Sequence, residues 1–217
     1  MELNPFTVFE ILGVAAFAIS GALSAMDRRM DLFGIFIIAF VTATGGGTIR
    51  DLLIDAVAVF WMERTTYIYM IGGFTILAIT FRNRLYFLKK SLFLFDTIGL
   101  GVFTITGVEA GIHSGLDPVV SIALGALTGA FGGVIRDILC NEIPVIFRKE
   151  NLYATPCLLG GFIFILMRNQ KFHIDVIYMV TSLTVIAIRL LAVKYHITLP
   201  TFYAGKDAKT LENLKQR

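Results

Sequence analysis

Charged residues are scarce in this sequence of 217 residues, because Asp, Glu, Lys and Arg together make up only 16% of it. Soluble domains carry roughly 25%. Hydrophobic residues supply 56% of the chain, and its mean hydropathy is +0.77. These values exclude an ordinary soluble domain and indicate an integral membrane protein.

Cysteine and histidine are also rare. The two cysteines, Cys140 and Cys157, fall in or beside apolar runs, so the sequence does not support a disulfide framework. The three histidines have no second ligand at metal spacing, and hydrolase, metalloprotease and phosphate-loop motifs are missing. We therefore expect no enzyme chemistry, no metal and no cofactor. The basic residues sit where membrane topology requires them, which gives no sign of nucleic-acid binding.

Long apolar runs dominate the sequence. They are continuous and carry small residues at helical spacing, which favours transmembrane helices over the alternating pattern of a β-barrel. The first run follows MELNPF, which has no basic segment, so we expect it to stay in the membrane as a span. With about 17–25 residues needed to cross a bilayer, the sequence predicts an all-α protein of seven transmembrane helices, at 7–26, 32–53, 67–81, 92–112, 118–140, 152–167 and 175–193.

The loop cations predict the orientation. With seven spans, the loops on the side of the C-terminus hold most of the lysines and arginines, including Arg28, Arg29, Arg82 and Arg84, whereas the other side holds few. The positive-inside rule therefore places the N-terminus outside and the C-terminus in the cytoplasm.

An internal repeat is the strongest pattern in the chain. Residues 9–53 align without a gap to residues 95–139, at a constant offset of 86, and 13 of the 45 pairs are identical. The identities include a glycine pair followed by an Arg-Asp pair, in GGGTIRD and GGVIRD. Chance similarity between apolar spans would not keep charged residues in register.

The repeat also predicts the organisation of the chain. Each copy has three spans, and this odd number forces the second copy into the membrane upside down, as in an inverted-topology repeat. We divide the chain into repeat one (1–86), repeat two (87–170), a seventh helix (171–195) and a cytoplasmic tail (196–217).

Glycine clusters lie next to the charged motifs, as Gly45, Gly46 and Gly47 in the second span and Gly132 and Gly133 in the fifth. Glycine costs a helix about 1 kcal/mol relative to alanine, and loosened backbone is tolerated in a membrane only where protein covers it or where it lines a wet cavity. We expect these clusters to be kinks beside a pathway, with close helix packing as the alternative.

The charged pairs Arg50–Asp51 and Arg136–Asp137 are the candidate functional residues, because ionisable groups inside a membrane often mark ion paths. Snorkelling of the arginines to the interface is the alternative. Neighbours on a helix point about 100° apart, so we expect each charge to pair with another helix or with water rather than with its neighbour. Four further residues are secondary candidates, as caps, interfacial groups or partners in pathway or bundle ion pairs: Glu10, Asp96, Glu109 and Arg189.

Seven spans, a three-plus-three inverted repeat and the doubled GGxxRD pattern together resemble the bacterial branch of the trimeric intracellular cation (TRIC) channel family. Bacterial members also carry the label of putative glycine transporter. The resemblance covers residues 5–195 and implies a homotrimer in a bacterial inner membrane.

The resemblance further implies one pore per protomer, permeable to monovalent cations and chiefly to potassium. It makes Gly45–Gly47, Gly132 and Gly133 the kinks of the pore helices, and Arg50, Asp51, Arg136 and Asp137 the charges of the pore or its gate. Phe131 stands where the first motif has Gly45, which makes the two halves unequal. A secondary transporter of a small amino acid such as glycine is the alternative, since inverted repeats are common in transporters too.

Overall fold

Every element that the structure describes is helical. The computed structural model describes residues 5–82, 84, 91–148 and 152–198, so most of the predicted tail at 196–217 lies outside the described residues. The elements are α1 (Pro5–Asp27), α2 (Leu32–Leu53), α3 (Phe60–Glu63), α4 (Thr66–Thr80), α6 (Ser91–His113), α7 (Pro118–Leu139), the 3₁₀ turn η1 (Val145–Phe147), α8 (Ala154–Asn169) and α9 (Ile174–Lys194).

Each predicted span coincides with one helix, but the helices differ in length. Five of them, α1, α2, α6, α7 and α9, are long and apolar enough to cross a membrane. The other two, α4 and α8, have 15 and 16 residues, which corresponds to about 22–24 Å at 1.5 Å per residue. This is shorter than the hydrocarbon core of about 30 Å.

Two aspartates start the helices that carry the glycine motifs. Asp31 caps α2 by accepting a hydrogen bond of 2.7 Å from the backbone nitrogen of Gly34. Asp117 caps α7 in the same way, with 2.8 Å to the nitrogen of Val119. A side chain that satisfies an otherwise free N–H group stabilises a helix start, so the two motifs begin their helices at matching positions.

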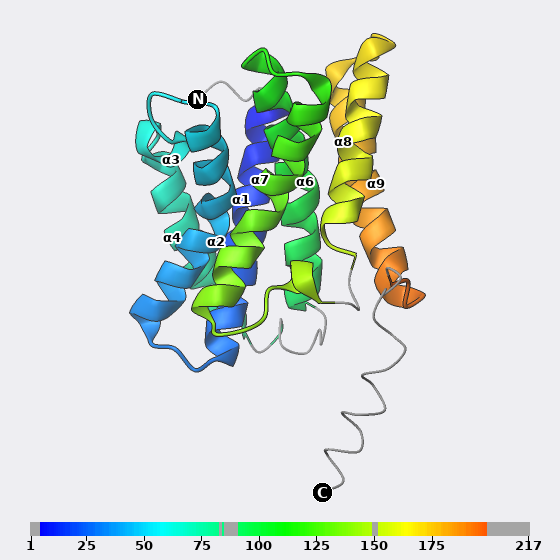
Figure 1. The fold of residues 1–217 in the computed structure, drawn as a ribbon. Helices are drawn as coiled ribbons and strands as arrows, with labels where there is room; N and C mark the ends of the chain where they lie inside the picture. The colour runs from blue at the N-terminus through cyan, green and yellow to red at the C-terminus, as the bar shows by residue number, and fades with distance from the viewer. Residues whose placement is uncertain (1–4, 83, 85–90, 149–151, 199–217) are drawn as a thin grey trace, which may run out of the picture.

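The helices stand side by side as a bundle (Figure 1), with α1, α2, α6 and α7 packed on one another in the middle. On one side of these four helices, α4 packs on α1 and α2. On the other side, α8 packs on α6 and α7, and α9 packs on α6 and α8. Helices α1 and α9 both run toward the lower end in Figure 1, where α2 begins and α7 ends. Charged residues at the ends of α2 and α7 therefore lie at opposite ends of the bundle.

The centre of the bundle is closely packed, and its contacts recur at the spacing of 86 residues. Phe17 of α1 stacks on Phe103 of α6 with ring centroids 5.1 Å apart. A Cβ atom on Gly46 would overlap the carbonyl oxygen of Thr128, and one on Gly132 would overlap that of Thr42. Helices α2 and α7 thus cross with their backbones in contact at two equivalent glycines.

Candidate functional site

At the upper end of the bundle in Figure 1, Arg50 and Asp51 lie in the last turn of α2 and are 6% and 5% exposed. Arg50 Nε donates to Asp51 Oδ1 over 2.7 Å, and the Asp51 Oδ2 atom accepts from the backbone nitrogen of Phe60 over 2.8 Å. The Phe60 ring faces the guanidinium at 5.6 Å. Asp51 therefore fixes both the arginine and the start of α3.

Glu10 of α1 lies nearby and is 6% exposed. Its carboxylate accepts a hydrogen bond from the hydroxyl of Tyr67 on α4. We call Glu10, Arg50, Asp51 and Tyr67 the N-terminal cluster. It borders a cavity of about 210 Å³ lined by Phe6, Thr7, Glu10, Phe60, Glu63, Arg64 and Tyr67.

At the opposite end, Arg136 of α7 is 1% exposed and holds three partners. Its Nε and Nη2 atoms donate to Asp137 Oδ1 over 2.9 and 2.8 Å. Its Nη1 atom reaches Asp96 Oδ1 of α6 at 2.6 Å and Ser20 Oγ of α1 at 2.8 Å. Arg136 thus ties three helices together.

Asp137 repeats the arrangement of Asp51, because its Oδ2 atom accepts from the backbone nitrogen of Val145 over 2.9 Å. Asp96 is 1% exposed, and the hydroxyl of Tyr153 lies 3.4 Å from its Oδ1 atom. On the other oxygen, Arg189 of α9 donates from Nη2 over 2.6 Å. We call Asp96, Arg136, Asp137, Tyr153 and Arg189 the C-terminal cluster.

The expectation that neighbouring charges would not pair is wrong, although Arg136 also pairs with Asp96 of another helix, as expected. Both arginines bond the adjacent aspartate, at 2.7 Å for Arg50 and 2.8 Å for Arg136. The physical reason is that each aspartate is anchored by its second oxygen to the following segment, at Phe60 or Val145. The carboxylate is therefore held within reach of the long arginine side chain despite the angle between the two positions.

The arginines are also too buried for snorkelling to describe them, since a snorkelling side chain keeps its charged head in water. Instead, both guanidinium groups are enclosed by protein and paired with carboxylates. Buried ion pairs of this kind are costly to desolvate, and a role for them in an ion path stays a prediction.

The five candidate glycines lie at close contacts. Helix α2 continues without a break through Gly45–Gly47, and α7 continues through Gly132 and Gly133. A Cβ on Gly47 would meet the Phe60 ring at 2.5 Å, and one on Gly45 would meet the Ile135 side chain at 2.8 Å. At Gly133 it would overlap the Tyr153 hydroxyl. These contacts support the packing alternative, and the kink stays a prediction.

Glu109, a secondary candidate, lies apart from both clusters. Its carboxylate accepts from the hydroxyl of Tyr178 on α9 and lies 3.5 Å from His113 Nε2.

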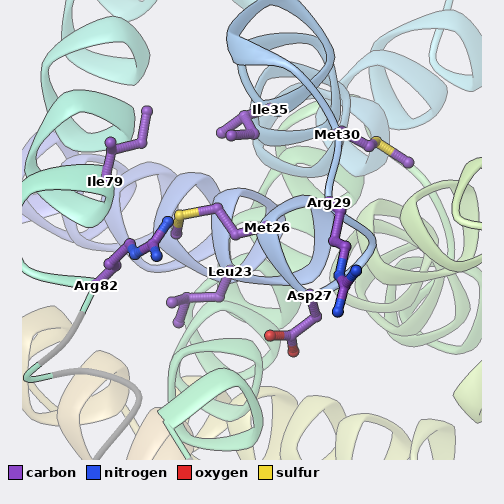
Figure 2. Close-up of a pocket in the computed structure, with 8 residues that line it drawn as sticks. All are labelled: Leu23, Met26, Asp27, Arg29, Met30, Ile35, Ile79 and Arg82. Carbon is purple, nitrogen blue, oxygen red and sulfur yellow. The ribbon is translucent and has the colours of Figure 1, made fainter.

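A larger cavity, about 510 Å³, opens among the ends of α1, α2 and α4, and Figure 2 shows Arg29 and Arg82 beside apolar side chains there. Its lining residues belong to neither cluster: Leu23, Met26, Asp27, Arg29, Met30, Ile35, Ile79 and Arg82.

The two tyrosines and Ser20 are not among the candidates that the sequence indicates. Tyr67 and Tyr153 are 86 residues apart, as are Glu10 and Asp96, but the tyrosines lie beyond the aligned segment 9–53. Extending the same offset past the charged motifs would have found them. Nothing in the sequence marks Ser20 as a partner of Arg136, because buried serines commonly bond within their own helix.

The chain is similar to a family of bacterial membrane proteins. A family model described as "Glycine transporter" matches residues 7–83 and again residues 93–169. The chain is 37% identical over 202 residues to the "UPF0126 inner membrane protein YadS" of Escherichia coli K12, covering 92% of this chain and 97% of that protein. A UPF0126 membrane protein of Vibrio cholerae is 37% identical over 209 residues, covering 95% and 86%.

Solved structures show the same fold. The TRIC trimeric intracellular cation channel orthologue from Rhodobacter sphaeroides matches with a TM-score of 0.83 and 31% identity, covering 88% of this chain and 98% of that one. A prokaryotic TRIC channel crystallised in 0.5 M KCl matches with 0.81 and 32%, covering 89% and 98%. The fold is that of an integral membrane protein and resembles the architecture of cation channels.

The chain belongs to the bacterial branch of the TRIC channel family, the group whose family model carries the glycine-transporter description. Its relatives include proteins named for the bacterial inner membrane.

Proposed function

We propose that this protein conducts monovalent cations, chiefly potassium, across a bacterial inner membrane, as a homotrimer in which each protomer has its own path. The observation that carries the proposal is the pair of charge clusters at opposite ends of one bundle, each with a buried arginine–aspartate pair and a further buried carboxylate. Similarity to trimeric cation channels supports it.

The path would run between the four central helices, from one cluster to the other. Carboxylates near a pore attract and concentrate cations, and here Asp51, Asp137, Glu10 and Asp96 supply that charge. The close crossing of α2 and α7 at Gly46 and Gly132 lies between the clusters. We propose that this crossing is the closed part of the path and that bending at the glycines opens it.

We also propose that the chain is an inverted duplication with seven spans. The two matches of the family model start at residues 7 and 93, which is the offset of 86. Asp51 and Asp137 stand at the same offset, and each accepts from a backbone N–H group nine or eight residues further along the chain. Under this proposal α4 and α8 also cross the membrane, with local thinning of the bilayer or flanking residues making up their short length.

The topology proposal follows from the loop cations. The loop from α1 to α2, which holds Arg28 and Arg29, lies at the lower end of Figure 1, where α7 and its Arg-Asp pair also end. The positive-inside rule makes that end cytoplasmic. The N-terminal cluster and its cavity then face the outside.

Transport of glycine is the second candidate, favoured by the description of the family model. The cavity at the N-terminal cluster adds to it, because Glu10, Arg64 and aromatic rings line one small volume. A zwitterion offers both an ammonium and a carboxylate group to such a lining.

Flux into liposomes that hold the purified protein separates the two candidates. A potassium gradient with an imposed potential and labelled glycine are compared in the same preparation. Rapid, potential-driven potassium flux that does not saturate supports the channel, whereas saturable glycine uptake without potassium current overturns it. Impermeant cations provide the control for leakage.

A further inference from the structure

Arg189 of α9 has no counterpart in the N-terminal half of the molecule. Helix α9 lies outside the segment that repeats, and it packs on α6 and α8. On α1 and α4, which correspond to α6 and α8, the described part of the chain offers no such helix. One charge of the C-terminal cluster is therefore supplied by an element that the N-terminal cluster lacks.

The packing of α9 places this arginine. A Cβ on Gly160 of α8 would overlap the Val185 side chain, and one on Gly101 of α6 would lie 3.2 Å from the carbonyl oxygen of Ser182. Both glycines thus let α9 approach closely. Arg189 lies one turn after Val185 on the same buried face, and its side chain points between α6 and α8 toward Asp96.

The site around Arg189 is buried and aromatic. Its guanidinium carbon lies 4.4 Å from the ring centre of Tyr153 and 5.1 Å from that of Phe93, and the residue is 2% exposed. Its Nε and Nη1 atoms are buried without a hydrogen-bond partner among the described residues. Burying a guanidinium group with two unbonded nitrogen atoms lowers the stability of the protein. The structure nevertheless keeps this charge next to Asp96.

The two clusters consequently differ in formal charge. The N-terminal cluster has the carboxylates Glu10 and Asp51 and the guanidinium of Arg50, giving one net negative charge. The C-terminal cluster has two carboxylates, Asp96 and Asp137, against two guanidinium groups, giving zero. Without Arg189 both clusters would carry one net negative charge.

We propose that Arg189 is a fixed counter-ion that sets the barrier to cations at the C-terminal cluster and so makes conduction asymmetric. It acts through Asp96, whose oxygen it occupies, rather than by contact with the permeating ion. Since like charges repel strongly in a poorly solvated site, a cation meets an attracting mouth at the N-terminal cluster and a neutral one at the C-terminal cluster. This inference rests on the proposed channel function.

Single-channel recording in symmetric potassium chloride tests it, with Arg189→Gln compared with the wild type. Removing the charge makes the two clusters equal, so we expect a several-fold larger potassium conductance and currents at opposite potentials that become nearly equal in size. Arg189→Lys keeps the charge and restores most of the wild-type asymmetry. Lys194→Gln removes a positive charge from an exposed position on the same helix and leaves the recordings unchanged.

Glu10→Gln provides the opposite test. It also makes the net charges of the two clusters equal, but at zero instead of at one negative charge. Here we expect the asymmetry to fall together with the conductance. A merely structural role for Arg189 would not give opposite changes in conductance with the same loss of asymmetry.

The outcomes are distinct. A wild type without potassium current overturns the channel function and this inference with it. A wild-type current whose size and asymmetry are unchanged in folded Arg189→Gln overturns only the role of Arg189. If Arg189→Gln fails to assemble, the charge-balanced double variant Asp96→Asn/Arg189→Gln decides: recordings like those of the wild type support the proposal, and a raised conductance overturns it.

Discussion

The N-terminal and C-terminal clusters are built from matching positions, yet they are held in different ways. In both clusters an aspartate accepts a hydrogen bond from the neighbouring arginine. Its other oxygen accepts from a backbone N–H group in the next segment, that of Phe60 in one case and of Val145 in the other. In the C-terminal cluster Arg136 reaches across to Asp96 and Ser20. In the N-terminal cluster Arg50 stays with Asp51, and Glu10 is bonded by Tyr67.

The difference shows how one added helix changes the use of a duplicated motif. Arg189 fills the C-terminal cluster with a second cation and ties Asp96 to α9, whereas a cavity of about 210 Å³ borders the N-terminal cluster. The C-terminal cluster is therefore a closed, cross-linked network and the N-terminal one is more open. Three pairs of substitutions at matched or contrasting positions test this comparison.

The largest effect is expected for Asp96→Asn, compared with Glu10→Gln at the matching position. Asp96 balances two buried guanidinium groups, and removing one partner of a buried ion pair costs about 3–5 kcal/mol. Glutamine at position 10 can still accept from Tyr67, so its loss of stability should be much smaller. The stability of both variants is measured by thermal unfolding in detergent, with the fraction of folded protein recorded as the temperature rises. Equal losses for the two variants would contradict a difference in cross-linking.

A smaller loss is expected where the two halves meet. Alanine at position 46 would overlap the carbonyl oxygen of Thr128, and overpacking of a well-packed core typically costs about 1–3 kcal/mol. Gly73→Ala is the control, because a Cβ there would meet no described atom within 4 Å apart from its chain neighbours and the nearby backbone of its own helix. There we expect a gain of up to about 1 kcal/mol from helix propensity. The same unfolding measurement applies, and a stable Gly46→Ala protein would argue against the tight crossing.

The smallest expected effect is the difference in stability between Tyr67→Phe and Tyr153→Phe. In Tyr67→Phe the buried carboxylate of Glu10 loses a hydrogen bond, and an unsatisfied buried group costs about 1–3 kcal/mol. In Tyr153→Phe the loss should be less, because the hydroxyl lies 3.4 Å from Asp96 and two arginines bond the same carboxylate. Midpoints of thermal unfolding for the two variants give the order, and a larger shift for Tyr153→Phe would reverse our assignment of the more open cluster.

Much of the fold could be predicted from composition and pattern. The seven predicted spans coincide with helices, because apolar length and continuous hydrophobicity fix a membrane helix locally. Polarity alone marks Asp96 and Arg189 as candidates, since ionisable groups are conspicuous in an apolar run, and the repeated motif also marks Arg136. Their joining into one network could not be predicted, because it depends on where α6, α7 and α9 meet.

The sequence by itself determined that this is a helical membrane protein, that its two Arg-Asp motifs stand 86 residues apart and that glycines precede each of them. These properties follow from local hydrophobicity and from register along one chain. Only the tertiary structure decided that each arginine pairs with its own neighbour, that the glycines mark a close crossing, and that Arg189 makes the two ends unequal. The reason is that ion pairs and backbone contacts depend on distances between helices, which hydropathy and periodicity do not encode.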